Sequence, residues 1–237
     1  MTAHISAAAV PTGVAMSDSD PIILDETRIA PTCTEPISRV GDSRWDLAPL
    51  LHKPTIADSQ AINFDTFPPP FRSAAKRLVW LCVNVPTPVE DLERPTAARS
   101  RLSVGSIIVY AGLLRLWMTW LEGEGIQQFG DVTEDVYRRY CSEVAASGLG
   151  RESQANRLFA ITRCWLYGPY LPETDTLIRP YWEDALARAD ILGDAKWSAE
   201  NRTPPIHPQT MSALLVWAIR FCTDFSEDII AAKHAKS

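Results

Sequence analysis

The feature that most constrains the fold of this chain is a run of apolar residues spaced three and four positions apart after Ser103. The residues that follow this spacing are Ile107, Tyr110, Leu113, Leu114, Trp117, Trp120 and Leu121. This period matches the turn of an α-helix, and Gly123 and Gly125 are residues that commonly end one. Because no useful length of the chain alternates with a period of two, we predict an all-α fold, a small helical bundle.

Five further segments carry the helical period. The segment 71–85 is predicted to be one helix that stops before Pro86, and another follows Asp131 and Thr133 and ends at Gly148. A third begins near Ser153 and stops at Gly168-Pro169. Beyond it, 176–192 and 207–232 are predicted to be extra C-terminal helices.

Residues 1–65 differ from the rest because they are rich in Pro, Ser, Thr and Asp and show no sustained period. Such a segment lacks the apolar density that offsets the entropy of ordering, so we predict a largely disordered acidic tail. Only 43–51 and 62–67 hold aromatic and aliphatic residues able to pin it to a folded body. We therefore expect three parts: the tail 1–65, a helical domain 66–171 and a helical linker 172–237.

Composition and charge narrow the classes of protein. The 237 residues are 46% hydrophobic and 22% charged, which is typical of globular chains. The net charge is −6, and dividing the chain at residues 71 and 170 gives −5, +2 and −3, so only the middle third is basic. No run of eighteen apolar residues is free of charge, since the longest stops at Arg115, and the first sixteen residues lack the basic start of a secretory signal. We expect a cytoplasmic protein with no membrane partner.

The residues for several kinds of catalysis are not arranged in recognisable motifs. The four histidines lie far apart, and the five cysteines occur singly, which argues against a metal site and a disulfide framework. The sequence has no GxSxG, GxxxxGK[ST] or GxGxxG motif. Acidic pairs such as Glu183 and Asp184 are typical of solvated helix faces. We predict no catalytic residues, no metal and no cofactor.

A group of polar and basic side chains at the start of a predicted helix is the strongest candidate for a binding site. Its members are Arg151, Ser153, Gln154, Asn156 and Arg157, with Arg163 further along the same helix and Ser106 at the start of another. A helix N-terminus offers free N–H groups and partial positive charge to a phosphate, and such side chains add donors. Arg72, Lys76 and Arg77 are predicted to neutralise further phosphates. Double-stranded DNA is the partner that this chemistry fits.

The segment from Ser106 to Leu171 resembles the core-binding domain of tyrosine recombinases of the phage-integrase type. The similarity rests on three groups of residues: Ser106, Ile107, Tyr110, Leu113, Leu114, Trp117, Trp120 and Leu121; then Gly125, Ile126, Asp131, Val132, Thr133, Val136 and Tyr140; then Ser153, Asn156, Leu158, Ile161 and Trp165. The segment 203–232 also resembles the join to the catalytic domain in long integrases. The resemblance implies a helical clamp on duplex DNA and a role in DNA integration and recombination.

The chain departs from that family in its catalytic residues. None of the four histidines has an Arg three positions later, so the HxxR motif of the family is absent. About 66 residues follow Leu171, which is too few for a catalytic domain. The resemblance therefore implies a recombinase fragment that binds DNA and does not cut it. The alternative is a non-catalytic interaction module that self-associates through its C-terminal apolar helix, around Trp217 and Phe221.

Overall fold

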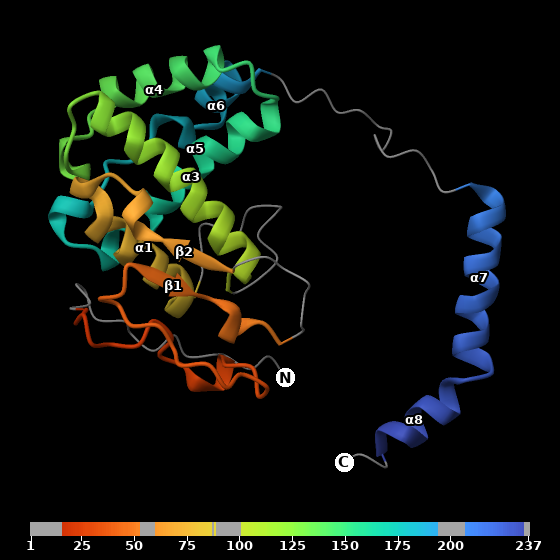
Figure 1. The fold of residues 1–237 in the computed structure, drawn as a ribbon. Helices are drawn as coiled ribbons and strands as arrows, with labels where there is room; N and C mark the ends of the chain where they lie inside the picture. Colours follow the sequence, from red (N-terminus) through yellow and green to blue (C-terminus); the bar gives the residue numbers. More distant parts are fainter. Residues whose placement is uncertain (1–15, 53–59, 87, 89–100, 194–206, 235–237) are drawn as a thin grey trace, which may run out of the picture. The chain divides into compact units, whose positions relative to one another are not determined.

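Helix α3 lies at the centre of the larger of two units into which the chain divides (Figure 1). The computed structural model describes residues 16–52, 60–86, 88, 101–193 and 207–234. The first unit, residues 1–194, is called the body here, and the second comprises residues 195–237. The described parts of the body are mainly helical, and the expected all-α class holds at that level.

Each body segment with the expected apolar period contains a helix, although only 185–192 of the expected helix 176–192 is α-helical. They are α1 (Arg72–Asn84), α3 (Val104–Gly123), α4 (Glu134–Ala146), α5 (Arg151–Leu166) and α6 (Ala185–Leu192). The Ser103 hydroxyl caps α3 by accepting a hydrogen bond from the Ser106 N–H. Helices α1 and α5 both pack on α3, and α4 packs on α5. Trp117 of α3 stacks on Phe129 at 5.0 Å between ring centroids, inside the core these helices share.

Short elements complete the body. Strands β1 (Arg44–Asp46) and β2 (Ala61–Asn63) pair antiparallel, with Trp45 opposite Ile62. Single 3-10 turns occur at Glu26–Arg28, Ala48–Leu50, Phe64–Thr66, Pro69–Phe71, Phe129–Asp131, Gly168–Tyr170, Glu173–Asp175 and Tyr181–Glu183. The segments that lack a helical period fold into these turns and strands.

The described part of the expected tail is folded, so the predicted disorder is wrong there. Ile22, Ile23, Trp45 and Leu47 are all buried in the common core. The Asn84 side chain at the end of α1 accepts from the Leu24 N–H at 2.9 Å and donates to the Ile22 carbonyl at 2.9 Å. The helical period does not mark this segment, because its core residues lie in turns and in two three-residue strands. The disorder expected for residues 1–15 and 53–59 concerns segments outside the described residues.

The expected boundary at residue 171 also differs from the structure. Residues 172–193 belong to the body, where Leu177 and Trp182 are buried. The Tyr137 hydroxyl of α4 donates to the Ile178 carbonyl at 2.9 Å, which ties this segment to the helices. The second unit begins at residue 195 and contains α7 (Pro208–Thr223) and α8 (Ser226–His234).

The α3 helix corrects one argument made from the sequence about membranes. It continues past Arg115, and its most apolar stretch of 18 residues has a mean hydropathy of 1.5, so by length and composition α3 is able to cross a bilayer. In the body 44% of that stretch is buried. Ile107, Leu114 and Leu121 on its inner face are fully buried, which is the packing of a core helix. The absence of a membrane partner stays a prediction.

Candidate nucleic-acid interface

The start of α5 is the part of the predicted interface that the structure leaves accessible. Helix α4 ends in a short turn in which Gly148 has a φ of +69°, a conformation that glycine adopts without strain. Gly150 then stands at the N-cap of α5 and provides no side-chain cap, so α5 begins at Arg151, two residues earlier than expected. The first-turn N–H groups of α5 are therefore not capped by the residue that precedes them.

The side chains of the first two turns divide into two groups. Ser153 and Asn156 are exposed, while Gln154 and Arg157 are half-buried. Because residues three and four positions apart share a helix face, Ser153, Asn156 and Arg157 lie together on one face of α5. Arg157 also lies near Tyr140 of α4. Burial raises the pKa of the Tyr140 hydroxyl to about 12, and the positive charge of Arg157 opposes part of that rise.

Arg151 contributes to the fold of the body in a way that the sequence did not indicate. Its Nε donates to the Leu192 and Gly193 carbonyls at 3.1 and 3.3 Å, and its Nη2 donates to the Gly193 carbonyl at 3.1 Å. These carbonyls end α6, where the helix dipole favours a cation. The predicted phosphate contact therefore has an intramolecular competitor.

Ser106 and Arg163 lie at the other end of α5. Tyr110, one turn after Ser106 on α3, contacts Cys164 with its hydroxyl oxygen 3.3 Å from Sγ. Cys164 lies thirteen positions after Arg151, or about 20 Å along a helix. The grouping of Ser106 with the start of α5 is therefore wrong.

Arg163 is 7% exposed, and its guanidinium lies over the Phe159 and Tyr110 rings at 4.9 and 5.6 Å. It is therefore not at the surface, as a DNA contact requires.

The three basic residues of α1 are half-buried and hold other parts of the body. Lys76 Nζ donates to the Val40 and Gly41 carbonyls at 2.9 and 3.2 Å. Arg72 donates to the Phe67 and Asp65 carbonyls at 3.1 and 3.0 Å. Arg77 Nε donates to an Asp175 carboxylate oxygen at 2.6 Å. All three of these predicted phosphate neutralisers are therefore engaged within the body. Arg72 and Lys76 bind carbonyls of the segment before α1, and Arg77 binds a carboxylate of the segment after α5.

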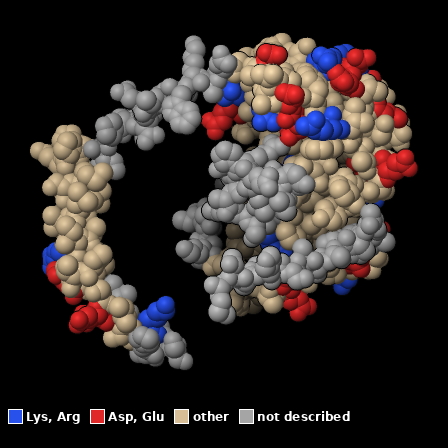
Figure 2. Space-filling model, turned by 180° about the vertical axis from the view of Figure 1, so that it is seen from behind, with Lys and Arg blue, Asp and Glu red and all other residues tan. Residues whose placement is uncertain are grey.

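Charges of both signs lie close together on the body. Figure 2 shows blue and red side chains interspersed on the face that it displays. Among the described residues, Arg138 pairs with Glu134 and Arg139 with Glu124 on or near α4. Such pairing reduces the positive potential available to a polyanion.

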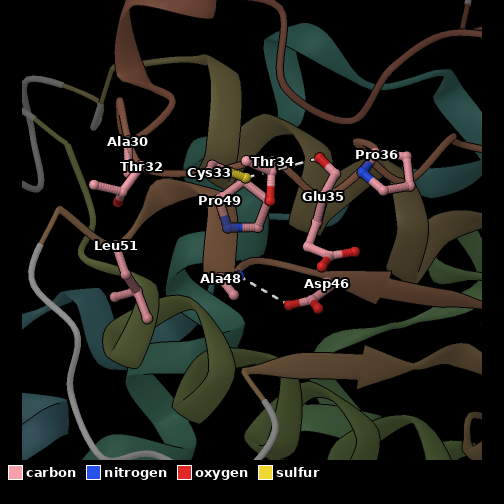
Figure 3. A pocket seen from close by; sticks show the side chains of 10 residues that line it. All are labelled: Ala30, Thr32, Cys33, Thr34, Glu35, Pro36, Asp46, Ala48, Pro49 and Leu51. Atoms are coloured by element: carbon pink, nitrogen blue, oxygen red, sulfur yellow. Dashed lines mark hydrogen bonds between the residues drawn. The ribbon is translucent and has the colours of Figure 1, made fainter.

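A shallow cavity in the N-terminal segment is a feature that the sequence did not indicate (Figure 3). It has a volume of about 240 Å³ and lies between residues 30–36 and 46–51. Glu35 and Asp46 line it, and the Asp46 carboxylate accepts from the Ala48 N–H at 2.9 Å. The Cys33 thiol is 3.7 Å from the Glu35 carbonyl. No sequence pattern marks this cavity, because its lining residues meet only when the segment folds.

The described residues bring no three His, Cys, Asp or Glu side chains together in a way that could hold a metal ion. Comparisons with known proteins add no assignment: no family model, no curated protein and no solved structure matches the chain.

Proposed function

We propose that the body is a DNA-binding module of the tyrosine-recombinase core-binding type, and that it binds duplex DNA without cutting it. The observation that supports this function is the start of α5, where an N-terminus without a side-chain cap and the exposed residues Ser153 and Asn156 share a face with Arg157. The contacts are therefore confined to Ser153, Gln154, Asn156 and Arg157, with Arg151 as a secondary contact.

The chemistry of this face fits a phosphate and the edge of a base. A phosphate oxygen accepts hydrogen bonds from the free N–H groups of the first turn, and the helix dipole adds a favourable field. Arg157 supplies the single full positive charge of the face. The Asn156 amide pairs donor and acceptor groups, which is the pattern that reads adenine in the major groove.

The charge of the chain sets the strength of this binding. A net charge of −6 opposes association with a polyanion, and five of the ten predicted contacts hold the body together instead. Because each phosphate contact contributes about −0.9 to the slope of log K against log salt, we expect a slope of only about −2, as for two contacts. The affinity is therefore modest and visible mainly at low ionic strength.

Fluorescence anisotropy of a labelled duplex, titrated with the chain at several salt concentrations, tests the proposal. Ser153→Asp is the informative variant, because an acidic residue in the first turn stabilises the helix while repelling a phosphate. We expect the Kd to rise tenfold or more, while the melting temperature stays unchanged or rises. Thr119→Asp is the matched control, since it adds the same charge at an exposed position on α3.

A second pair of variants separates a specific contact from the effect of net charge. Arg157→Gln and Arg139→Gln remove the same charge, but Arg139 is paired with Glu124. We expect Arg157→Gln alone to reduce the salt slope by about 1. No binding at about 25 mM salt, a Kd independent of salt, or equal effects of the two members of either pair would overturn the proposal.

A further inference from the structure

Helix α7 carries large apolar side chains on all of its sides. None of its 16 residues is buried. The exposed fraction is 39% for Met211 and between 52% and 60% for Leu214, Leu215, Val216, Trp217, Ile219 and Phe221. We call these seven residues the α7 surface. A helix that is apolar all round is normally covered on its sides, whereas single exposed hydrophobic residues are common.

The charges near α7 are confined to its C-terminal end. The stretch from His207 to Ile219 contains no Asp, Glu, Lys or Arg. Arg220 Nε lies 3.1 Å from an Asp224 carboxylate oxygen, and its guanidinium lies over the Trp217 ring at 5.1 Å. Figure 2 shows the same division, with tan along α7 and blue and red only near its junction with α8. The apolar stretch therefore offers a partner no charge to pair with, and its complement is another apolar surface.

The order of large and small residues along one face favours a second copy of the same helix in the opposite direction. Met211, Leu214, Ala218 and Phe221 recur at intervals of three and four and form one stripe. Antiparallel pairing about position 216 places Leu214 against Ala218 and Met211 against Phe221, so large residues meet small ones and sulfur meets an aromatic ring. Parallel pairing would set Ala218 against Ala218 and leave a gap.

The helix ends agree with the same direction. Antiparallel pairing opposes the two helix dipoles and brings Asp224 of one copy level with Pro208 of the other. A carboxylate is favourable at that position, because the N-terminus of a helix carries partial positive charge. Parallel pairing would bring like charges together, with Glu227 and Asp228 of the two copies side by side.

The exposed area is enough for a reversible dimer. Half of the area of an aromatic side chain is roughly 100 Å² for each of Trp217 and Phe221. With the five other residues, the α7 surface totals on the order of 500 Å² in each chain, and a single partner helix covers only the part on and beside the stripe, compared with about 800 Å² per partner in a standard interface. This area predicts association that dissociates on dilution.

We propose that the chain self-associates through α7, which packs antiparallel against α7 of a second copy. This goes beyond the DNA contact of α5 and does not depend on it. The two interactions also respond oppositely to salt, because apolar association is not weakened by ionic strength.

Sedimentation velocity of the full chain between about 2 and 100 μM is the test. We expect the mass to shift with concentration from 26.3 kDa to twice that value. The Leu214→Asp, Trp217→Asp double variant should stay a monomer throughout. Val109→Asp is the control, since Val109 is 62% exposed on α3 and lies outside the α7 surface. It should leave the association constant unchanged within about twofold.

The direction of pairing has its own test in a Cys222→Ser background. Leu214→Cys and Ala218→Cys chains, mixed and oxidised, should form the mixed disulfide faster than either homodimer. A wild-type monomer at 100 μM, dimerisation that survives the double Asp variant, or aggregates without a defined mass would overturn the proposal. So would faster homodimer cross-linking, or a monomer that binds phosphatidylglycerol vesicles through α7.

Discussion

Arg77 and Asp175 form an ion pair across 98 positions of the sequence, with Nε of the arginine 2.6 Å from a carboxylate oxygen. The Asp175 side chain is only 10% exposed, and that of Arg77 is 34% exposed. The pair joins α1 to the 3-10 turn Glu173–Asp175. It is a direct reason why residues after Leu171 belong to the body and do not form a linker.

Removing Arg77 should destabilise the body, because it leaves a nearly buried carboxylate without its cation. We expect Arg77→Ala to lower the free energy of unfolding by about 2–3 kcal/mol, measured by urea denaturation. Arg138→Ala breaks an exposed pair with Glu134 and should have little effect. Equal effects of the two variants would contradict the structural role of Arg77.

Trp45 tests whether the N-terminal segment is part of the fold. Its side chain is fully buried, and its ring meets that of Phe64 edge-on at 4.7 Å. Trp45→Ala should cost about 3–5 kcal/mol, since it removes a large core side chain. Leu24→Ala, at a 54% exposed position in the same segment, should cost no more than about 0.5 kcal/mol. An unchanged denaturation midpoint for Trp45→Ala would restore the tail interpretation.

Thr162 connects α5 to the segment before α6 through its hydroxyl. Trp182 Nε1 donates to Thr162 Oγ1 at 3.1 Å, and that hydroxyl donates to a Glu183 carboxylate oxygen at 2.7 Å. Thr162→Val keeps the shape and removes both bonds, so we expect a loss of about 1–3 kcal/mol. In thermal denaturation, Thr162→Ser should retain more stability than Thr162→Val, and the reverse order would exclude the hydrogen-bond explanation.

The stability of the body should fall at alkaline pH through Cys164. Burial raises the pKa of this thiol from 9.0 to about 12. In the unfolded chain the thiol loses its proton near pH 9, while in the fold it stays protonated. The contribution of the protonated thiol to the free energy of unfolding is therefore fully present below pH 9. It is lost between pH 9 and 12, at up to about 1.4 kcal/mol per pH unit.

Cys164→Ala checks this contribution. Urea denaturation at pH 8, 9, 10 and 11 should show a shallower loss of stability for the variant than for the wild type. Tyr110 and Tyr137 are also buried with raised pKa values, so a residual alkaline loss remains in the variant. Parallel pH profiles for the two proteins would show that Cys164 does not titrate in this range.

The helices of the body were predictable, and their ends less so. The apolar period placed α3 within a residue of its start, because Ser103 is both the last residue before the period and a good N-cap. At α5 the same reasoning chose Ser153, yet the helix begins at Arg151 behind Gly150. The preference of Ser for an N-cap is local, and in the structure Gly150 occupies that position two residues before the expected start.

The predicted binding residues divide according to what surrounds them. Ser153 and Asn156 stay exposed because they lie on the outer face of α5. Lys76 and Arg77 were expected to be free because the residues that bind them, at 40–41 and 175, lie far away in sequence. No pattern along α1 indicates those partners.

The sequence alone determined the helical class, the positions of the main helices and the apolar character of α7, because each depends on neighbours within a few positions. Only the tertiary structure decided that residues 16–52 fold as part of the body, and which cations remain accessible at the surface. Those outcomes depend on carbonyl and carboxylate groups that distant segments bring next to a side chain. A guanidinium or an ammonium group binds such oxygens as readily as it binds a phosphate.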